Sequence, residues 1–112
     1  KLYMVSNKLR LKYPDKVPVV IKKDKSCKHL KKIGSIKYLV QDHITVGQFI
    51  YILRKRIELQ QEEALYLFVR DNKSKTQYTL CGNDEIITVY NNYKNEKDCI
   101  LYLTYAGENV FG

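Results

Sequence analysis

The side chains that could carry catalytic or metal chemistry are few and poorly spaced for it. Cys27, Cys81 and Cys99 form no C-x-x-C pair, and His29 and His43 lie fourteen residues apart. Zinc sites use closer pairs of ligands, and three cysteines cannot close a disulfide framework. No nucleophile paired with a base and no phosphate-binding loop is visible. The sequence therefore predicts a non-enzyme without metal or cofactor, whose thiols are reduced in a cytosolic or nuclear compartment.

The end of the chain is a second place where chemistry could occur, because it closes on Phe111 and Gly112. Glycine has no Cβ, so a terminal glycine fits a narrow channel and adopts backbone angles that other residues avoid. The aromatic ring before it offers a large apolar anchor to a partner enzyme or protease. Taken alone, an F-G ending favours an ordinary frayed terminus, the usual fate of chain ends.

The net charge is +8, from 20 Lys and Arg against 12 Asp and Glu. Such a surface attracts phosphates, anionic lipid and acidic peptides, although solubility alone is the simpler explanation. Six lysines fall between positions 22 and 32: Lys22, Lys23, Lys25, Lys28, Lys31 and Lys32. A solvated loop is the simplest prediction for them, and a contact with anionic lipid or acidic ligand flanks is the alternative. No apolar run approaches the roughly 18 residues that span a bilayer.

Two helical patterns lie between strand-like runs. Strands are predicted at Val17–Lys23, Ile36–Val40, Ala64–Val69 and Cys99–Tyr105. The first helix opens at Thr45, because T-V-G-Q is a capping box in which Thr45 and Gln48 exchange hydrogen bonds. Its apolar stripe comprises Val46, Phe49, Ile50, Leu53 and Ile57. Arg54, Lys55 and Arg56 close it, where cations suit the helix dipole and solvent. A second helix is expected to begin after Asn83, which would be its N-cap.

This order, ββαβαβ, predicts an α+β domain without internal repeats or a linker. A four-stranded sheet crossed by a helix is the ubiquitin-like β-grasp, although a ferredoxin-like arrangement also fits the pattern. We expect residues 1–12 to be a helical segment, 13–105 the domain, and 106–112 an exposed tail. The chain starts with Lys1 rather than Met, so its natural N-terminus is expected upstream.

Several short strings together resemble the autophagy-related protein 8 (GABARAP-type) family of ubiquitin-like modifiers. They occur in the family's order, close to its spacing, over nearly the whole chain. They are K-Y-P-D-K-V-P-V (Lys12 to Val19), K-Y-L-V (Lys37 to Val40), T-V-G-Q-F (Thr45 to Phe49), R-K-R-I (Arg54 to Ile57) and G-E-N-V-F-G (Gly107 to Gly112). The resemblance implies a β-grasp preceded by N-terminal helices, of which residues 1–12 would be the remainder.

The resemblance also implies a reaction in which this protein is the substrate. An activating enzyme would adenylate the Gly112 carboxylate with ATP, and the acyl group would pass through enzyme cysteines to the amine of phosphatidylethanolamine. Phe111 would serve recognition of the tail by these enzymes and by a processing cysteine protease. The protein would be cytoplasmic and, once lipidated, on autophagosomal membranes, because two acyl chains hold a protein stably on a bilayer.

Family members also bind cargo receptors and adaptors through an aromatic-x-x-aliphatic motif, which adds a strand to a sheet edge. Carried onto this chain, the aromatic pocket would use Leu9, Pro18, Lys37, Leu39 and Ile100. The aliphatic pocket would use Tyr38, Val40, Ile44, Phe49 and Ile52. Lys16 and Arg56 would meet acidic flanks of the ligand. Simpler roles remain open, since Phe49 also belongs to the apolar stripe and surface charges are often only solvated.

The chain departs from the family pattern at a few places. Gln41 stands where the family usually has Pro, and Val5 where an acidic residue is usual. The segment Asn72–Asp84 differs most, so a second ligand face described for some members is not carried over. These changes bear on ligand selectivity rather than on the fold or the tail.

Two other classes compete with a lipid-linked modifier. A β-grasp modifier of the autophagy-related protein 12 type would be attached to protein, and the terminal glycine suits that as well. A basic nucleic-acid-binding module is suggested by the charge and the ten tyrosines. The basic residues are scattered, however, and no RNA-binding sheet motif appears. We therefore expect no specific nucleic-acid partner.

Overall fold

The structure is a computed structural model that describes residues 11–25, 27 and 34–107. The predicted helical segment 1–12 lies outside this part except for Leu11 and Lys12, which are helical. Seven elements follow along the chain. They are β1 (Lys16–Lys23), β2 (Ile36–Gln41), α2 (Val46–Ile57), β3 (Tyr66–Arg70), β4 (Gln77–Thr79), α3 (Ile86–Tyr93) and β5 (Leu101–Ala106).

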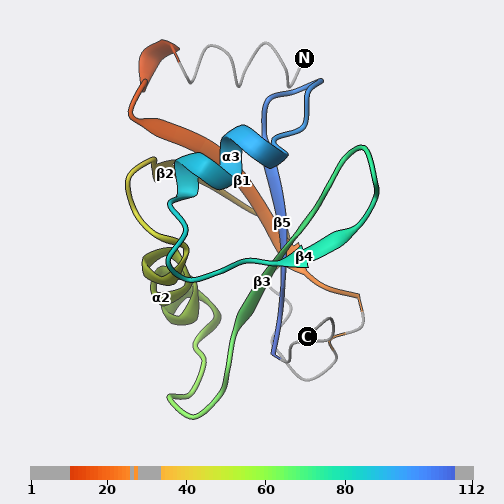
Figure 1. Cartoon of the computed structure of the whole chain (residues 1–112). Helices are drawn as coiled ribbons and strands as arrows, with labels where there is room; N and C mark the ends of the chain where they lie inside the picture. Colours follow the sequence, from red (N-terminus) through yellow and green to blue (C-terminus); the bar gives the residue numbers. More distant parts are fainter. Residues whose placement is uncertain (1–10, 26, 28–33, 108–112) are drawn as a thin grey trace.

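The strands form one mixed sheet in the order β2-β1-β5-β3-β4 (Figure 1). The central strand, β5, runs parallel to its neighbour β1, and the other neighbouring strands are antiparallel. The α+β class is confirmed, but the predicted count of four strands is wrong. The missed strand, β4, is three residues long and polar (Q-Y-T), so its pattern predicts nothing by itself. It forms by pairing with β3, where Phe68 lies opposite Thr79.

Alternation of side chains along the strands divides the sheet into two faces. On the first face, β1 contributes Val17, Val19 and Ile21, all at most 1% exposed. Helix α2 covers this face, since the Phe49 ring packs edge-on against Tyr38 of β2 at 5.6 Å between centroids. The core therefore lies between α2 and the sheet.

Helix α2 begins and ends as the sequence predicts. The Gln48 N–H donates to Thr45 Oγ1 at 3.1 Å, and the Thr45 N–H donates to Gln48 Oε1 at 2.9 Å, which completes the capping box. The backbone of Glu58 adopts a left-handed conformation (φ 61°), and its N–H donates to the last-turn carbonyls of Arg54 and Lys55. Both ends are thus closed by local hydrogen bonds, and the predicted stripe is buried at Val46, Phe49, Leu53 and Ile57.

The start of α3 corrects the sequence prediction. Asn83 is not its cap: the N-cap is Glu85, and no side chain closes the helix there. Instead, the Ile86 N–H donates to the Ile44 carbonyl at 2.9 Å, and the Ile87 N–H donates to the Asp42 carbonyl at 3.0 Å. The loop before α2 therefore satisfies the free N–H groups of α3, a non-local solution that no cap motif reveals.

Arg54 has a structural role beyond the helix dipole. Its guanidinium donates to the carbonyls of Glu63 at 2.5 Å, Gln60 at 2.7 Å and Gln61 at 3.3 Å. These three carbonyls belong to the loop that joins α2 to β3. A planar fork of donors suits such a set, which an ammonium group could not reproduce.

We expect Arg54→Met to lower the free energy of unfolding by about 1–3 kcal/mol, the usual size of hydrogen bonds to a charged group. Lys55→Met is the matched control, because Lys55 is exposed in the same turn and its ammonium lies 4.5 Å from the centre of the Tyr51 ring, a cation–π contact on the helix itself. Urea unfolding monitored by circular dichroism measures both. Equal destabilisation by the two variants would contradict the role given to Arg54.

Candidate peptide-binding edge

Strand β2 lies at one edge of the sheet and pairs only with β1 among the described residues. The Asp42 N–H donates to the Asp15 carbonyl at 2.9 Å. In an antiparallel ladder, hydrogen-bonded pairs alternate with non-bonded ones, so this contact fixes the phase of the ladder. It places Leu39, opposite Pro18, at a non-bonded position, and Lys37 likewise. The backbone N–H and C=O groups of Lys37 and Leu39 therefore face away from β1, toward the edge.

The predicted aromatic-pocket residues gather on the second face of the sheet, opposite α2. Leu39 is 38% exposed and lies directly beside Pro18 on the neighbouring strand. Ile100, only 8% exposed, precedes Leu101, which pairs with Val19. Pro18 is also buried, so Pro18 and Ile100 can form a floor beside the exposed Leu39. Leu9, the remaining apolar member of the predicted set, lies outside the described residues.

The predicted aliphatic-pocket residues divide between core and surface. Phe49 is 1% exposed and Val40 5%, so both belong to the core. Tyr38 and Ile44 are partly buried against that core, and Ile52 is 44% exposed. The surface available to a ligand between β2 and α2 is therefore supplied by Tyr38, Ile44 and Ile52.

A hollow of about 710 Å³ lies at the start of α2 and contains two of these side chains, Ile44 and Ile52. Its other lining residues are Thr45, Gly47, Gln48, Tyr51, Gly82 and Asn83. Sequence reasoning missed Tyr51, although an exposed aromatic outside the apolar stripe was the available signal. It also missed Gly82, which reaches the hollow because the Gly47 N–H donates to its carbonyl at 2.9 Å.

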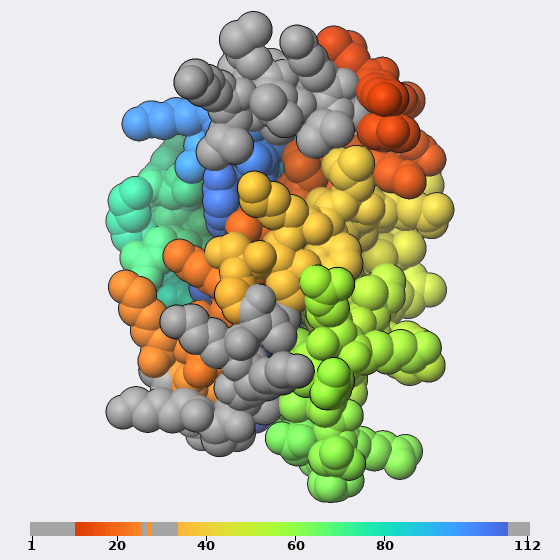
Figure 2. Space-filling view, turned by 180° about the vertical axis from the view of Figure 1, so that it is seen from behind, coloured from red at the N-terminus to blue at the C-terminus, as the bar shows by residue number. Residues whose placement is uncertain are grey.

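Positive side chains border this edge on both sides. Lys37 is exposed on β2, and Arg56 is exposed in the last turn of α2. Lys16, at the start of β1, is partly buried with its ammonium 5.5 Å from the centre of the Tyr13 ring. Figure 2 shows that β2, coloured gold, reaches the surface across the middle of one side of the molecule. Acidic residues flanking a bound peptide would meet complementary charge here.

The tail residues Phe111 and Gly112 lie outside the described residues. The described chain continues from β5 through Ala106, which is buried opposite Tyr66, to Gly107. Gly107 therefore follows the carboxyl end of a central strand.

No ionisation anomaly marks a catalytic centre in the described part of the chain. The resolved shift is at Tyr102, where burial, the hydrogen bond to Asp98 and the negative charge of Asp98 together raise the pKa to about 12, with burial the largest cause. The phenol is thus a neutral donor at physiological pH. Among the described residues, no three His, Cys, Asp or Glu side chains gather as metal ligands. No helix in this part is long and apolar enough to cross a bilayer.

A mixed sheet in which the first and last strands of the domain lie side by side and parallel, crossed on one face by a helix, is a ubiquitin-like fold. The chain belongs to the family described as "Autophagy protein Atg8 ubiquitin like", whose pattern it matches over residues 2–112. It is 43% identical over 108 residues to Autophagy-related protein 8 of Schizosaccharomyces pombe, covering 96% of this chain and 82% of that protein. It is 40% identical over 107 residues to Autophagy-related protein 8e of Arabidopsis thaliana, covering 96% and 81%. The crystal structure of Trypanosoma brucei ATG8 superimposes with a TM-score of 0.83 at 32% identity, covering 99% of this chain and 89% of that one.

Proposed function

We propose that this protein is conjugated through Gly112 to phosphatidylethanolamine on autophagic membranes and there recruits cargo receptors and adaptors. The ligands carry an aromatic-x-x-aliphatic motif and bind as an added strand on β2. The protein is then a substrate and an adaptor, with no catalytic residues of its own. Activating and conjugating enzymes, and a deconjugating cysteine protease, act on its tail.

The observation that carries the adaptor role is the edge of β2. Leu39 and Lys37 direct their backbone groups away from β1, and no strand of the described chain lies on that outer side of β2. An extended peptide satisfies such groups by β-augmentation. Its alternate side chains would then meet Leu39 with Pro18 on one side of the strand and Ile44 with Ile52 on the other.

The conjugation role is supported by family membership, since the matched region extends to Gly112. A chain that leaves a central strand can extend away from the domain, where enzymes reach it without unfolding the sheet. A lipid with two acyl chains, at about 0.8 kcal/mol per buried CH₂, anchors a protein more stably than one chain does.

We expect Leu39→Ala to weaken binding of an acidic aromatic-x-x-aliphatic peptide by about 1–3 kcal/mol, the size of an interface anchor. Isothermal titration calorimetry measures the change. Tyr78→Ala is the control, because Tyr78 is similarly exposed (43% against 38%) but lies on β4, at the opposite edge of the sheet. Equal affinity of Leu39→Ala and the parent would place the pocket elsewhere.

Amide hydrogen exchange tests the added strand itself. Peptide binding should slow exchange at the Leu39 amide, which faces the edge, and leave the Tyr38 amide, which faces β1, nearly unchanged. Slowing of both amides alike, or of neither, would contradict β-augmentation at β2.

A further inference from the structure

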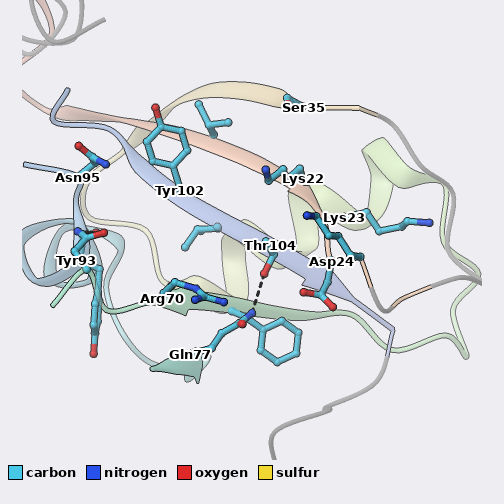
Figure 3. A pocket seen from close by; sticks show the side chains of 15 residues that line it. Lys22, Lys23, Asp24, Ser35, Arg70, Gln77, Tyr93, Asn95, Tyr102 and Thr104 are labelled. Carbon is cyan, nitrogen blue, oxygen red and sulfur yellow. Dashed lines mark hydrogen bonds between the residues drawn. The ribbon is translucent and has the colours of Figure 1, made fainter. Parts of the chain in front are cut away.

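A second hollow, of about 560 Å³, lies on the face of the sheet opposite α2, the face that also carries Leu39 and Pro18. Its walls come from β1, β3, β4 and β5, from Tyr93 at the end of α3, and from the segments before β2 and β5 (Figure 3). We call it the basic hollow, because four of its described lining residues are cationic and one is acidic. These are Lys22, Lys23, Lys25 and Arg70, with Asp24 as the acid.

The neutral lining suits a phosphate-bearing ligand. Gln77 and Thr104 are adjacent, with Gln77 Nε2 3.4 Å from Thr104 Oγ1, and Figure 3 shows both beside Arg70. Tyr102 adds an aromatic wall, and its hydroxyl already donates to Asp98. Amide, hydroxyl and guanidinium groups supply hydrogen-bond donors for phosphate oxygens, and the lysines add charge.

The position of the basic hollow relates it to the tail. In the parallel pair of central strands, Lys22 lies beside Thr104 and Lys23 beside Tyr105. Strand β5 ends at Ala106, so the lysines stand at the end of the sheet from which the chain continues to Gly112. The five residues after Gly107 reach at most about 18 Å when fully extended. A lipid attached to Gly112 therefore keeps this end of the sheet close to the bilayer.

We propose that the basic hollow binds the phosphate groups of anionic lipids in the membrane that carries the protein. This inference rests on the proposed lipid conjugation, which supplies the proximity. The contact would orient the domain, directing the β1 and β5 ends toward the bilayer, and it would be sensitive to salt. Lys28, Lys31 and Lys32 lie outside the described residues.

The test compares two double variants of the unconjugated protein. Lys22→Gln with Lys25→Gln removes two exposed cations at the basic hollow. Lys12→Gln with Lys97→Gln removes two exposed cations that precede β1 and β5, at the opposite end of both strands. Both variants have the same net charge. Sedimentation measures the fraction of protein bound to vesicles of phosphatidylcholine and phosphatidylethanolamine. The vesicles are prepared with and without about 30% phosphatidylserine.

We expect the parent to bind the anionic vesicles and the hollow variant to bind them about 10- to 30-fold more weakly, as two membrane-proximal lysines imply. The control variant should lose less than about threefold in affinity for the anionic vesicles. Its substituted charges lie far from the membrane surface relative to the Debye length. Equal losses in the two variants would overturn the inference. So would an acidic peptide that binds the basic hollow in preference to the vesicles.

Conjugation measured in parallel separates the two claims. With the activating and conjugating enzymes of a relative and neutral vesicles that contain phosphatidylethanolamine, both variants should be lipidated at the parent rate. Normal lipidation with no selective loss of anionic-vesicle binding overturns the basic hollow alone. If the parent is not lipidated, but the hollow variant still loses binding to anionic vesicles selectively, the proposed function is overturned and the lipid-binding site remains.

Discussion

Gly112→Ala is expected to abolish formation of the phosphatidylethanolamine adduct. The added methyl group meets the walls of any channel shaped for a terminal glycine and removes backbone angles that only glycine adopts freely. A misplacement of about 1 Å at a reacting carboxylate costs on the order of 100-fold in rate. Formation of the adduct is measured in a reconstituted reaction that contains activating enzyme, conjugating enzyme, ATP and phosphatidylethanolamine vesicles.

Two controls give this variant its meaning. Asn109→Ala changes the same tail but keeps the terminal Phe111 and Gly112, and it should be lipidated normally. The Gly112→Ala protein should also bind the aromatic-x-x-aliphatic peptide with unchanged affinity, because the β2 edge is elsewhere in the fold. Unchanged lipidation of Gly112→Ala would contradict conjugation through the terminal glycine.

Phe49→Ala is expected to lower the free energy of unfolding by about 3–5 kcal/mol, as large core truncations of aromatic residues do. The Phe49 ring is 1% exposed and stands at 87° to the Tyr38 ring across the contact between α2 and β2. Its removal loses buried apolar area and leaves a cavity between helix and sheet. Such a loss is a large part of the 5–15 kcal/mol that stabilises a typical domain.

Urea unfolding measures this loss, and Tyr51→Ala is its control. Tyr51 lies on the same helix but is 61% exposed, so its truncation should change the free energy of unfolding by less than about 1 kcal/mol. The contrast decides between the two roles considered for Phe49. A stable Phe49→Ala variant that fails to bind peptide would show that the ring is a pocket wall rather than part of the core.

The elements predicted well are those whose signals are local. Thr45 and Gln48 specify the start of α2 by a hydrogen-bonded exchange within four residues, and the structure contains that exchange. The start of α3 could not be predicted in this way. Its first N–H groups, at Ile86 and Ile87, bond to carbonyls about 40 residues earlier in the chain. Strand β4 was missed for the same reason, since its identity depends on pairing with β3.

The candidate site shows the same division between local and non-local information. Alternation along β2 predicts that Leu39 and Val40 face opposite ways, and they are 38% and 5% exposed. That β2 is an edge strand depends on the order of strands in the sheet, which periodicity does not contain. The hydrogen bond between Gly47 and Gly82, beside Ile52, is also a tertiary contact that the sequence pattern does not predict.

Attachment to a membrane lipid through Gly112 is the step on which the proposed function depends. The most direct test is the intact mass of the protein recovered from cell membranes after induction of autophagy, with the adduct located by peptide mapping. We expect a mass raised by one phosphatidylethanolamine, carried on the peptide that ends at Gly112. Recovery of only the free carboxylate, or of a conjugate to another protein, would contradict it.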